Sequence, residues 1–210
     1  MTGRLAVRCF RSRNMKPNKT TGETELTFEF PQMKGGDDRL SEMILYVCAK
    51  CADDPSFGAT KLNKILWCSD FIAYFERGEP ITGTAYQRLS KGPAPKYLVP
   101  TRRKMIHRRE LGIEPRSFFN KVVERPVALR PAKIDGLFKS TDIAIVDEVI
   151  RKLWGVTALT VSELSHLSKC WTTAKDGELI PYESVFLADN EITEQDIAET
   201  KELAAKHGWE

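Results

Sequence analysis

Two cysteines at positions 48 and 51 form the pair with the most obvious chemistry in this sequence. Thiolates at this spacing can share a metal ion or act as a redox pair, but structural zinc takes four ligands. His166 and Cys170 could supply the other two ligands. Both Cys48 and Cys51 fall on the apolar face of a predicted helix, however, where a free cysteine behaves as a small hydrophobic residue. We therefore expect both to be core residues, and we expect no metal site.

Other residues that could do catalytic chemistry do not form a complete set. Glu163 and His166 match half of a di-iron motif of helical bundles, and the chain holds no second copy. Ser165 and His166 are neighbours on a predicted helix and do not face each other, so they are no nucleophile–base pair. No glycine-rich phosphate loop, GxSxG elbow or HExxH motif is present. We expect a structural hydrogen bond from His166, no enzyme and no cofactor. The alternative is an enzyme with a polar pocket of Lys61, Asp70, Tyr86 and His166.

Positive charge is densest between residues 96 and 109. The cluster consists of Lys96, Arg102, Arg103, Lys104, His107, Arg108 and Arg109. A helix is predicted over residues 96–111. Pro100 limits where it can start, because a proline is tolerated only near the start of a helix. Such a basic face, with Met105 and Ile106 turned away from it, can bind nucleic-acid phosphates or an acidic protein. No helix-turn-helix, zinc finger or aromatic platform accompanies the cluster, so we favour an acidic protein partner. A nucleic-acid-binding regulator that uses the basic segments stays open as the alternative.

Two predicted helices lie before this basic segment. Apolar residues at helical spacing predict the first helix, and Asp37 or Asp38 is its expected N-cap. Its stripe is Leu40, Met43, Ile44, Val47, Cys48 and Cys51. The second predicted helix begins at about Thr60 as its N-cap, runs to Arg77 and is followed by Gly78. Its predicted buried stripe is Leu62, Ile65, Leu66, Ile72 and Phe75.

Turns and short strands are predicted around and after the second helix. Residues 79–83 and 92–95 have the glycine and proline content of turns. Residues 84–89, between them, fit a short strand or a helical turn. Residues 118–129 favour a strand or hairpin arm at a sheet edge, because Pro126 cannot donate to a ladder.

The last third of the chain has mostly helical periodicity. A helix over residues 142–154 follows Ser140 or Thr141 as its cap. A shorter helix begins at Thr160, where a capping-box spacing occurs, and a final helix is predicted over residues 193–208. The expected fold class is therefore mainly α with a small β element.

Charge and composition separate the N-terminus from the rest. Residues 1–38 are basic without an acid until residue 23, and residues 25–30 alternate as a half-buried strand would. We expect a basic N-terminal extension over residues 1–38, with one possible strand, and one domain over residues 39–210. The whole chain has a net charge of +3. Hydrophobic residues make up 41% and charged residues 29% of it, which is an ordinary composition for a globular protein. No apolar run suits a membrane helix, no secretory signal is present, and the five cysteines show no disulfide framework. A cytoplasmic protein with reduced thiols and no membrane partner is expected.

An ordered set of short motifs is more specific than any of these features. The set is Lys61-Leu62-x-Lys64, Asp70, Ile81-Thr82-Gly83, Tyr86, Gly92-Pro93-Ala94-Pro95, Glu163-Leu164-Ser165-His166, Trp171 and Ile180-Pro181-Tyr182. Over about residues 40–187, this order resembles the Panacea domain, also called the SocA-like antitoxin domain, and the phage-associated GepA-like proteins. The resemblance implies a compact, mostly helical domain with a small β element, in a bacterial or phage protein.

The same resemblance implies a function. It implies an antitoxin that neutralises a cognate toxin by direct binding, and it adds a role as adaptor to an ATP-dependent protease. The motif residues are expected to maintain the fold, as a buried Lys–Asp pair or a His–Trp contact would, or to act directly: Lys61, Lys64, Asp70, Gly83, Gly92, Pro93, His166 and Trp171. We expect the partner-binding surface at Thr82, Tyr86, Arg88 and Tyr97, with Arg102, Arg103, Arg108 and Arg109 beside it.

Overall fold

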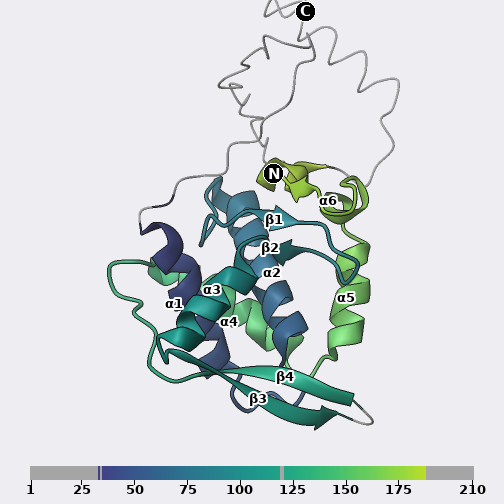
Figure 1. The fold of residues 1–210 in the computed structure, drawn as a ribbon. Helices are drawn as coiled ribbons and strands as arrows, with labels where there is room; N and C mark the ends of the chain where they lie inside the picture. The colour runs from purple at the N-terminus through teal and green to yellow at the C-terminus, as the bar shows by residue number, and fades with distance from the viewer. Residues whose placement is uncertain (1–32, 34, 119–120, 188–210) are drawn as a thin grey trace, which may run out of the picture.

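The computed structural model of the chain describes residues 33, 35–118 and 121–187. The fold of this part is mainly α with a small β element, which confirms the predicted class (Figure 1). Its helices are α1 (Gly36–Lys50), α2 (Ala59–Arg77), α3 (Leu98–His107), α4 (Ser140–Leu153), α5 (Ala158–His166), α6 (Lys169–Thr172) and the 3-10 helix η1 (Tyr182–Phe186). Its strands are β1 (Tyr86–Gln87), β2 (Ala94–Pro95), β3 (Leu111–Phe118), β4 (Lys121–Ala128) and β5 (Leu179–Ile180). The predicted strand over residues 25–30 and the predicted helix over residues 193–208 lie outside the described residues.

Helix α1 buries the whole stripe that its sequence predicts. Leu40, Met43, Ile44 and Val47 are at most 4% exposed, and Cys48 and Cys51 lie in the same hydrophobic cluster. The prediction that both cysteines are core residues is confirmed. Their burial raises the pKa of each thiol to about 12. The helix begins at Gly36, with Gly35 in the N-cap position, so the prediction of an aspartate cap is wrong. The predicted domain division at residue 38 falls in its first turn, and the division itself stays a prediction.

Helix α2 runs through the centre of the fold and contacts α1, α4, α5 and η1 (Figure 1). It begins at Ala59 after Gly58, not at a Thr60 cap, and it ends at Gly78 as predicted. Gly78 has a φ of 75°, which a glycine adopts without strain.

The predicted buried stripe of α2 is correct in its first half only. Leu62, Ile65 and Leu66 are at most 1% exposed, but Ile72 is 39% and Phe75 is 59% exposed. In this second half Asp70, Phe71 and Tyr74 are buried toward β1 and η1, and Ala73 is buried in the same cluster as α1 and α4. The prediction is wrong for Ile72 and Phe75, because the described elements beside them, α6 and η1, cover their face only in part.

A β-hairpin replaces the C-terminal end of the helix predicted over residues 96–111. Helix α3 ends at His107, and Arg109 has a φ of 57°, which turns the chain out of the helix. Strands β3 and β4 then pair in antiparallel register from Leu111 opposite Ala128. The hairpin arm predicted over residues 118–129 is confirmed, whereas β3 was not predicted. A second, three-stranded sheet has the order β2-β1-β5, and β1 confirms the short strand predicted within residues 84–89.

Helices α4 and α5 begin earlier than predicted. Helix α4 begins at Ser140, where the carboxylate of Asp142 accepts a hydrogen bond from the backbone N–H of Lys139. Helix α5 begins at Ala158, because the hydroxyl of Thr157, not Thr160, is the cap. Across the described ranges, no helix is long and apolar enough to cross a membrane.

Candidate functional site

The carboxylate of Asp70 is the centre of a buried hydrogen-bond network. Asp70 is 0% exposed and accepts hydrogen bonds from the backbone N–H groups of Ile81 (2.8 Å) and Thr82 (2.6 Å). It also accepts from the hydroxyls of Thr82, Tyr86 (2.7 Å) and Tyr182 (3.4 Å). Burial raises the pKa of Asp70 above its usual value, and the donors from Thr82, Tyr86 and Ile81 oppose that shift. Asp70 therefore fixes the turn that follows α2.

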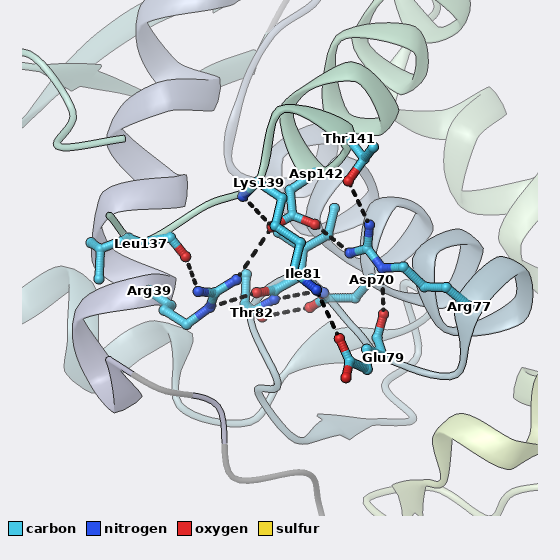
Figure 2. A network of polar contacts seen from close by, with 10 residues as sticks. All are labelled: Arg39, Asp70, Arg77, Glu79, Ile81, Thr82, Leu137, Lys139, Thr141 and Asp142. Carbon is cyan, nitrogen blue, oxygen red and sulfur yellow. Dashed lines mark hydrogen bonds and ion pairs between the residues drawn. The ribbon is translucent and has the colours of Figure 1, made fainter. Parts of the chain in front are cut away.

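A second network lies behind this turn (Figure 2). Arg39 of α1 is 6% exposed, and its Nε donates to the carbonyl oxygen of Ile81 at 2.7 Å. Asp142 of α4 forms ion pairs with Arg39 and with Arg77 of α2. Figure 2 shows these side chains converging from three helices on the turn at residues 81–82. The turn is thus held from both sides.

Lys61 forms a buried ion pair, but with Asp54 and not with Asp70. Its Nζ lies 2.5 Å from the Asp54 Oδ2 atom, and the two side chains are 0% and 1% exposed. Lys61 and Asp70 are about 13 Å apart along α2, at 1.5 Å of rise per residue. The prediction of a buried Lys–Asp pair is confirmed for Lys61 and wrong for Asp70 as its partner. Asp54 also accepts from the backbone N–H of Gly155, which ties the α1–α2 turn to the end of α4.

Lys64 of α2 holds the Gly92-Pro93 turn through a hydrogen bond. Its Nζ, on a side chain that is almost fully buried, donates to the carbonyl oxygen of Pro93 at 2.9 Å. A Cβ at position 92 would lie 2.6 Å from this Nζ and 2.3 Å from the Ser165 hydroxyl, and Gly92 has a φ of 92°. The turn therefore needs glycine at this position for both space and backbone conformation.

The buried amine of Lys64 predicts a pH-dependent stability. Burial lowers its pKa from 10.5 to about 8. Between these values the unfolded chain keeps a proton that the folded chain has lost, so raising the pH favours the folded state. We expect the stability of the wild type relative to Lys64→Met to rise by on the order of 2–3 kcal/mol from about pH 7 to pH 10. Urea denaturation of both proteins measures this difference, in which other titrating groups cancel. A difference that does not change with pH would contradict a buried, titrating Lys64.

A stack of three side chains, His166, Trp171 and Arg88, lies beside Leu89. The rings of His166 and Trp171 stack with centroids 4.2 Å apart, and the guanidinium of Arg88 lies 3.9 Å from the Trp171 ring. The Trp171 indole donates to the carbonyl oxygen of Leu89 at 3.2 Å. The expected His–Trp contact is confirmed. The expected structural hydrogen bond is not found at Nε2 of His166, which is buried without a partner among the residues that the structure describes.

The motif residues thus act on one segment, residues 80–97. Asp70 fixes its beginning, Trp171 its middle and Lys64 its end, while the hydroxyl of Tyr182 donates to the carbonyl oxygen of Thr84 at 2.7 Å. Gly83, with a φ of 71°, turns the chain between two of these points. We call residues 80–97 the anchored loop. Its anchors come from α2, α6 and η1, so the order of the motifs in the sequence reflects one structural unit.

The polar pocket of the enzymatic alternative is not assembled. Lys61 pairs with Asp54, Asp70 and Tyr86 lie in their own buried network, and His166 stacks on Trp171. No group of three or more histidine, cysteine, aspartate or glutamate side chains that could hold a metal ion occurs within residues 35–118 and 121–187.

The residues predicted to bind a partner divide into buried and exposed ones. Thr82 is 5% and Tyr86 0% exposed, so the expected surface does not include these two side chains. Arg88 is half-buried, because it stacks on Trp171 and donates to the carbonyl oxygen of Ala174. Tyr97 is 53% exposed. The four arginines lie on and just after α3: Arg102, Arg103, Arg108 and Arg109.

Helix α3 presents apolar residues as well as charge. Val99 is 56% exposed. Of the two residues predicted to turn away from the basic face, Met105 is 2% exposed, whereas Ile106 is 42% exposed and stays on the surface of α3. Arg102 pairs with Glu124 of β4 at 3.4 Å. Arg103, Arg108 and Arg109 are exposed. The outer face of α3 is therefore both basic and apolar, which suits a protein partner better than phosphate alone.

Several supporting residues were missed from the sequence. Asp54, Arg125, Arg39 and Asp142 are all buried and charged, and each holds a junction between elements. Arg125 donates to the carbonyl oxygens of Asp54 (3.1 Å) and Cys51 (3.0 Å), which joins β4 to the α1–α2 turn. No motif or spacing distinguishes these four residues from the exposed charged residues of the chain, so the sequence does not predict that they are buried.

Comparison with known proteins gives one result. The family model described as "Antitoxin SocA-like, Panacea domain" matches residues 62–172, just over half of the chain. No curated protein and no solved structure matches. The matched range contains Lys64, Asp70, the whole anchored loop, His166 and Trp171. Because the match covers the unit that these residues build, the chain belongs to the family of SocA-like antitoxins with a Panacea domain.

Proposed function

We propose that this protein is a cytoplasmic antitoxin that neutralises a cognate protein toxin by direct, stoichiometric binding. The family match is the observation that carries the proposal. The structure supports it with a loop that is fixed at several points, since a preorganised surface loses little entropy when it binds. An adaptor role toward an ATP-dependent protease belongs to the same proposal.

The partner is expected to meet the exposed part of this region. The surface begins at Arg88 and Tyr97 on the anchored loop and continues over Val99, Arg103 and Ile106 on α3. Tyrosine and arginine are enriched among residues that dominate binding energy, because they combine large contact area with directional hydrogen bonds. We call these five residues the α3 surface and propose that an acidic, partly apolar face of the toxin binds there.

A titration of toxin activity against this protein tests the proposal. The toxin is taken to be the product of the neighbouring gene, co-expressed and purified separately. We expect inhibition that saturates near a fixed molar ratio and that reverses when the two proteins are separated. Inhibition of excess toxin by a small fraction of an equivalent, leaving the toxin modified, would show that the antitoxin is an enzyme instead.

Charge reversal in the same assay tests the α3 surface. The variant Arg103→Glu/Arg108→Glu changes one residue of the α3 surface and the exposed arginine that follows α3. It should slow association with the toxin by about tenfold or more, because opposite charges steer protein association. The matched control Lys133→Glu/Lys152→Glu makes the same change of charge at exposed residues elsewhere. Equal rates for both variants would place the interface elsewhere. Tight binding of the isolated protein to duplex DNA at physiological salt would favour the nucleic-acid alternative.

A further inference from the structure

The exposed apolar residues of α2 form the wall of a groove on the side of α2 that faces α6 and η1. The groove has a volume of about 340 Å³. Its lining is mostly apolar and includes Trp67, Phe71, Ile72, Phe75, Cys170 and Val185. Phe186 of η1 extends the wall, since its ring centroid lies 5.7 Å from that of Phe75.

This groove is open to solvent in the part of the chain that the structure describes. Phe75 is 59%, Phe186 48% and Ile72 39% exposed. Adjoining exposed apolar residues of this size mark an interaction site. The helical spacing of α2 also predicts Ile72 and Phe75 to be buried, which indicates that a further segment covers them.

The lining of the groove indicates what that segment brings. Phe71, Ile72, Phe75 and Val185 make this lining mostly apolar. The segment that fills the groove should therefore carry apolar side chains.

We propose that the chain's own C-terminal segment, residues 188–210, docks in this groove. The segment starts directly after Leu187, one residue beyond Phe186 at the groove wall. Its sequence predicts a helix over residues 193–208 that carries Ile197 and Leu203 among many carboxylates. It thus supplies apolar side chains of the kind that the groove would bury.

The lengths of groove and segment agree. Six residues, 187–192, join η1 to the predicted helix and span up to about 21 Å when extended. The groove follows α2 from Trp67 to Phe75, which is about 12 Å at 1.5 Å per residue. A helix over residues 193–208 is about 24 Å long and covers this distance.

The N-terminal segment is the other part of the chain that could cover the groove. It enters the described fold at Met33, which lines a different cavity together with Arg39 and Arg77. Phe75 and Arg77 are two positions apart on α2 and therefore point about 200° apart. The C-terminal segment is the better occupant, because it starts on the side of α2 where the groove lies.

Limited proteolysis of the full-length chain tests this assignment. The variant Phe75→Asp places a charge in the groove, and Phe75 is exposed enough for the domain to tolerate it. The matched control Leu159→Asp introduces the same charge at a residue of α5 that is 70% exposed and does not line the groove. Trypsin cleavage after Lys201 and Lys206 is followed by mass spectrometry.

We expect the cleavage after Lys201 and Lys206 to be slow in the wild type and in Leu159→Asp. It should become about tenfold faster or more in Phe75→Asp, because cleavage follows the population of the undocked segment. Cleavage after Arg151 should stay unchanged, which shows that the domain remains folded. Fast cleavage in all three proteins would overturn the proposal and leave the groove to a partner protein. Deprotection of sites before Met33, with Lys201 unaffected, would assign the groove to the N-terminal segment instead.

Discussion

Replacing Asp70 by alanine is expected to lower the free energy of unfolding by about 3–5 kcal/mol or more. The change removes the acceptor for two buried backbone N–H groups, of Ile81 and Thr82, and for the hydroxyls of Thr82, Tyr86 and Tyr182. Each buried donor left without a partner costs about 1–3 kcal/mol. Because a domain of this size has a total stability of only about 5–15 kcal/mol, the variant should be close to unfolding at ambient temperature.

The variant Tyr86→Phe is the matched control for this network. It removes one of the donors and leaves the Asp70 carboxylate with its other partners, so we expect a loss of only about 1 kcal/mol. Urea denaturation followed by circular dichroism measures both variants. Losses of similar size for Asp70→Ala and Tyr86→Phe would mean that Asp70 does not hold the turn. Toxin binding by Tyr86→Phe should persist, because the Tyr86 side chain is buried and does not reach the α3 surface.

The family motifs have a common structural explanation. Asp70, Lys64 and Trp171 are distant in sequence, but each hydrogen-bonds the backbone of the anchored loop. Their side chains all hold backbone groups of this loop in one conformation.

The spacing of apolar residues alone predicted an element correctly where one face of that element packs against the core along its whole length. The stripe from Leu40 to Cys51 predicted α1 and its buried cysteines, because a helix that packs on one side repeats its apolar residues every three or four positions. Gly78 marked the end of α2 for an equally local reason, since its φ is positive. Such features depend on neighbouring residues only.

Tertiary partners decided the features that the sequence did not predict. Lys61 and Lys64 are buried because Asp54 and the Pro93 carbonyl meet them, and neither contact follows from helical spacing. The helix expected over residues 96–111 ends early because Arg109 adopts a positive φ that leads into the β3–β4 hairpin. Thr82 and Tyr86 looked suited to an interface by type, but the carboxylate of Asp70 draws both into the interior.

The buried pair of Lys61 and Asp54 should show the second large effect. Lys61→Ala leaves the Asp54 carboxylate 1% exposed and without the ammonium that lies 2.5 Å away. Removing one partner of a buried ion pair costs about 3–5 kcal/mol, because the remaining charge stays desolvated. Lys152→Ala is the control, since Lys152 pairs with Glu148 at the surface, where such pairs contribute at most about 1 kcal/mol.

A double-mutant cycle separates the ion pair from the other bonds of Asp54. Asp54→Asn keeps an oxygen that can accept from the backbone N–H groups of Ser56 and Gly155, but it removes the charge. We expect the loss of stability in Lys61→Ala/Asp54→Asn to be smaller than the sum of the two single losses by about 1–3 kcal/mol, because the double variant leaves no unpaired charge. Chemical denaturation of the four proteins gives this coupling. Additive losses would show that Arg125, which contacts the Asp54 backbone, already compensates the carboxylate without Lys61.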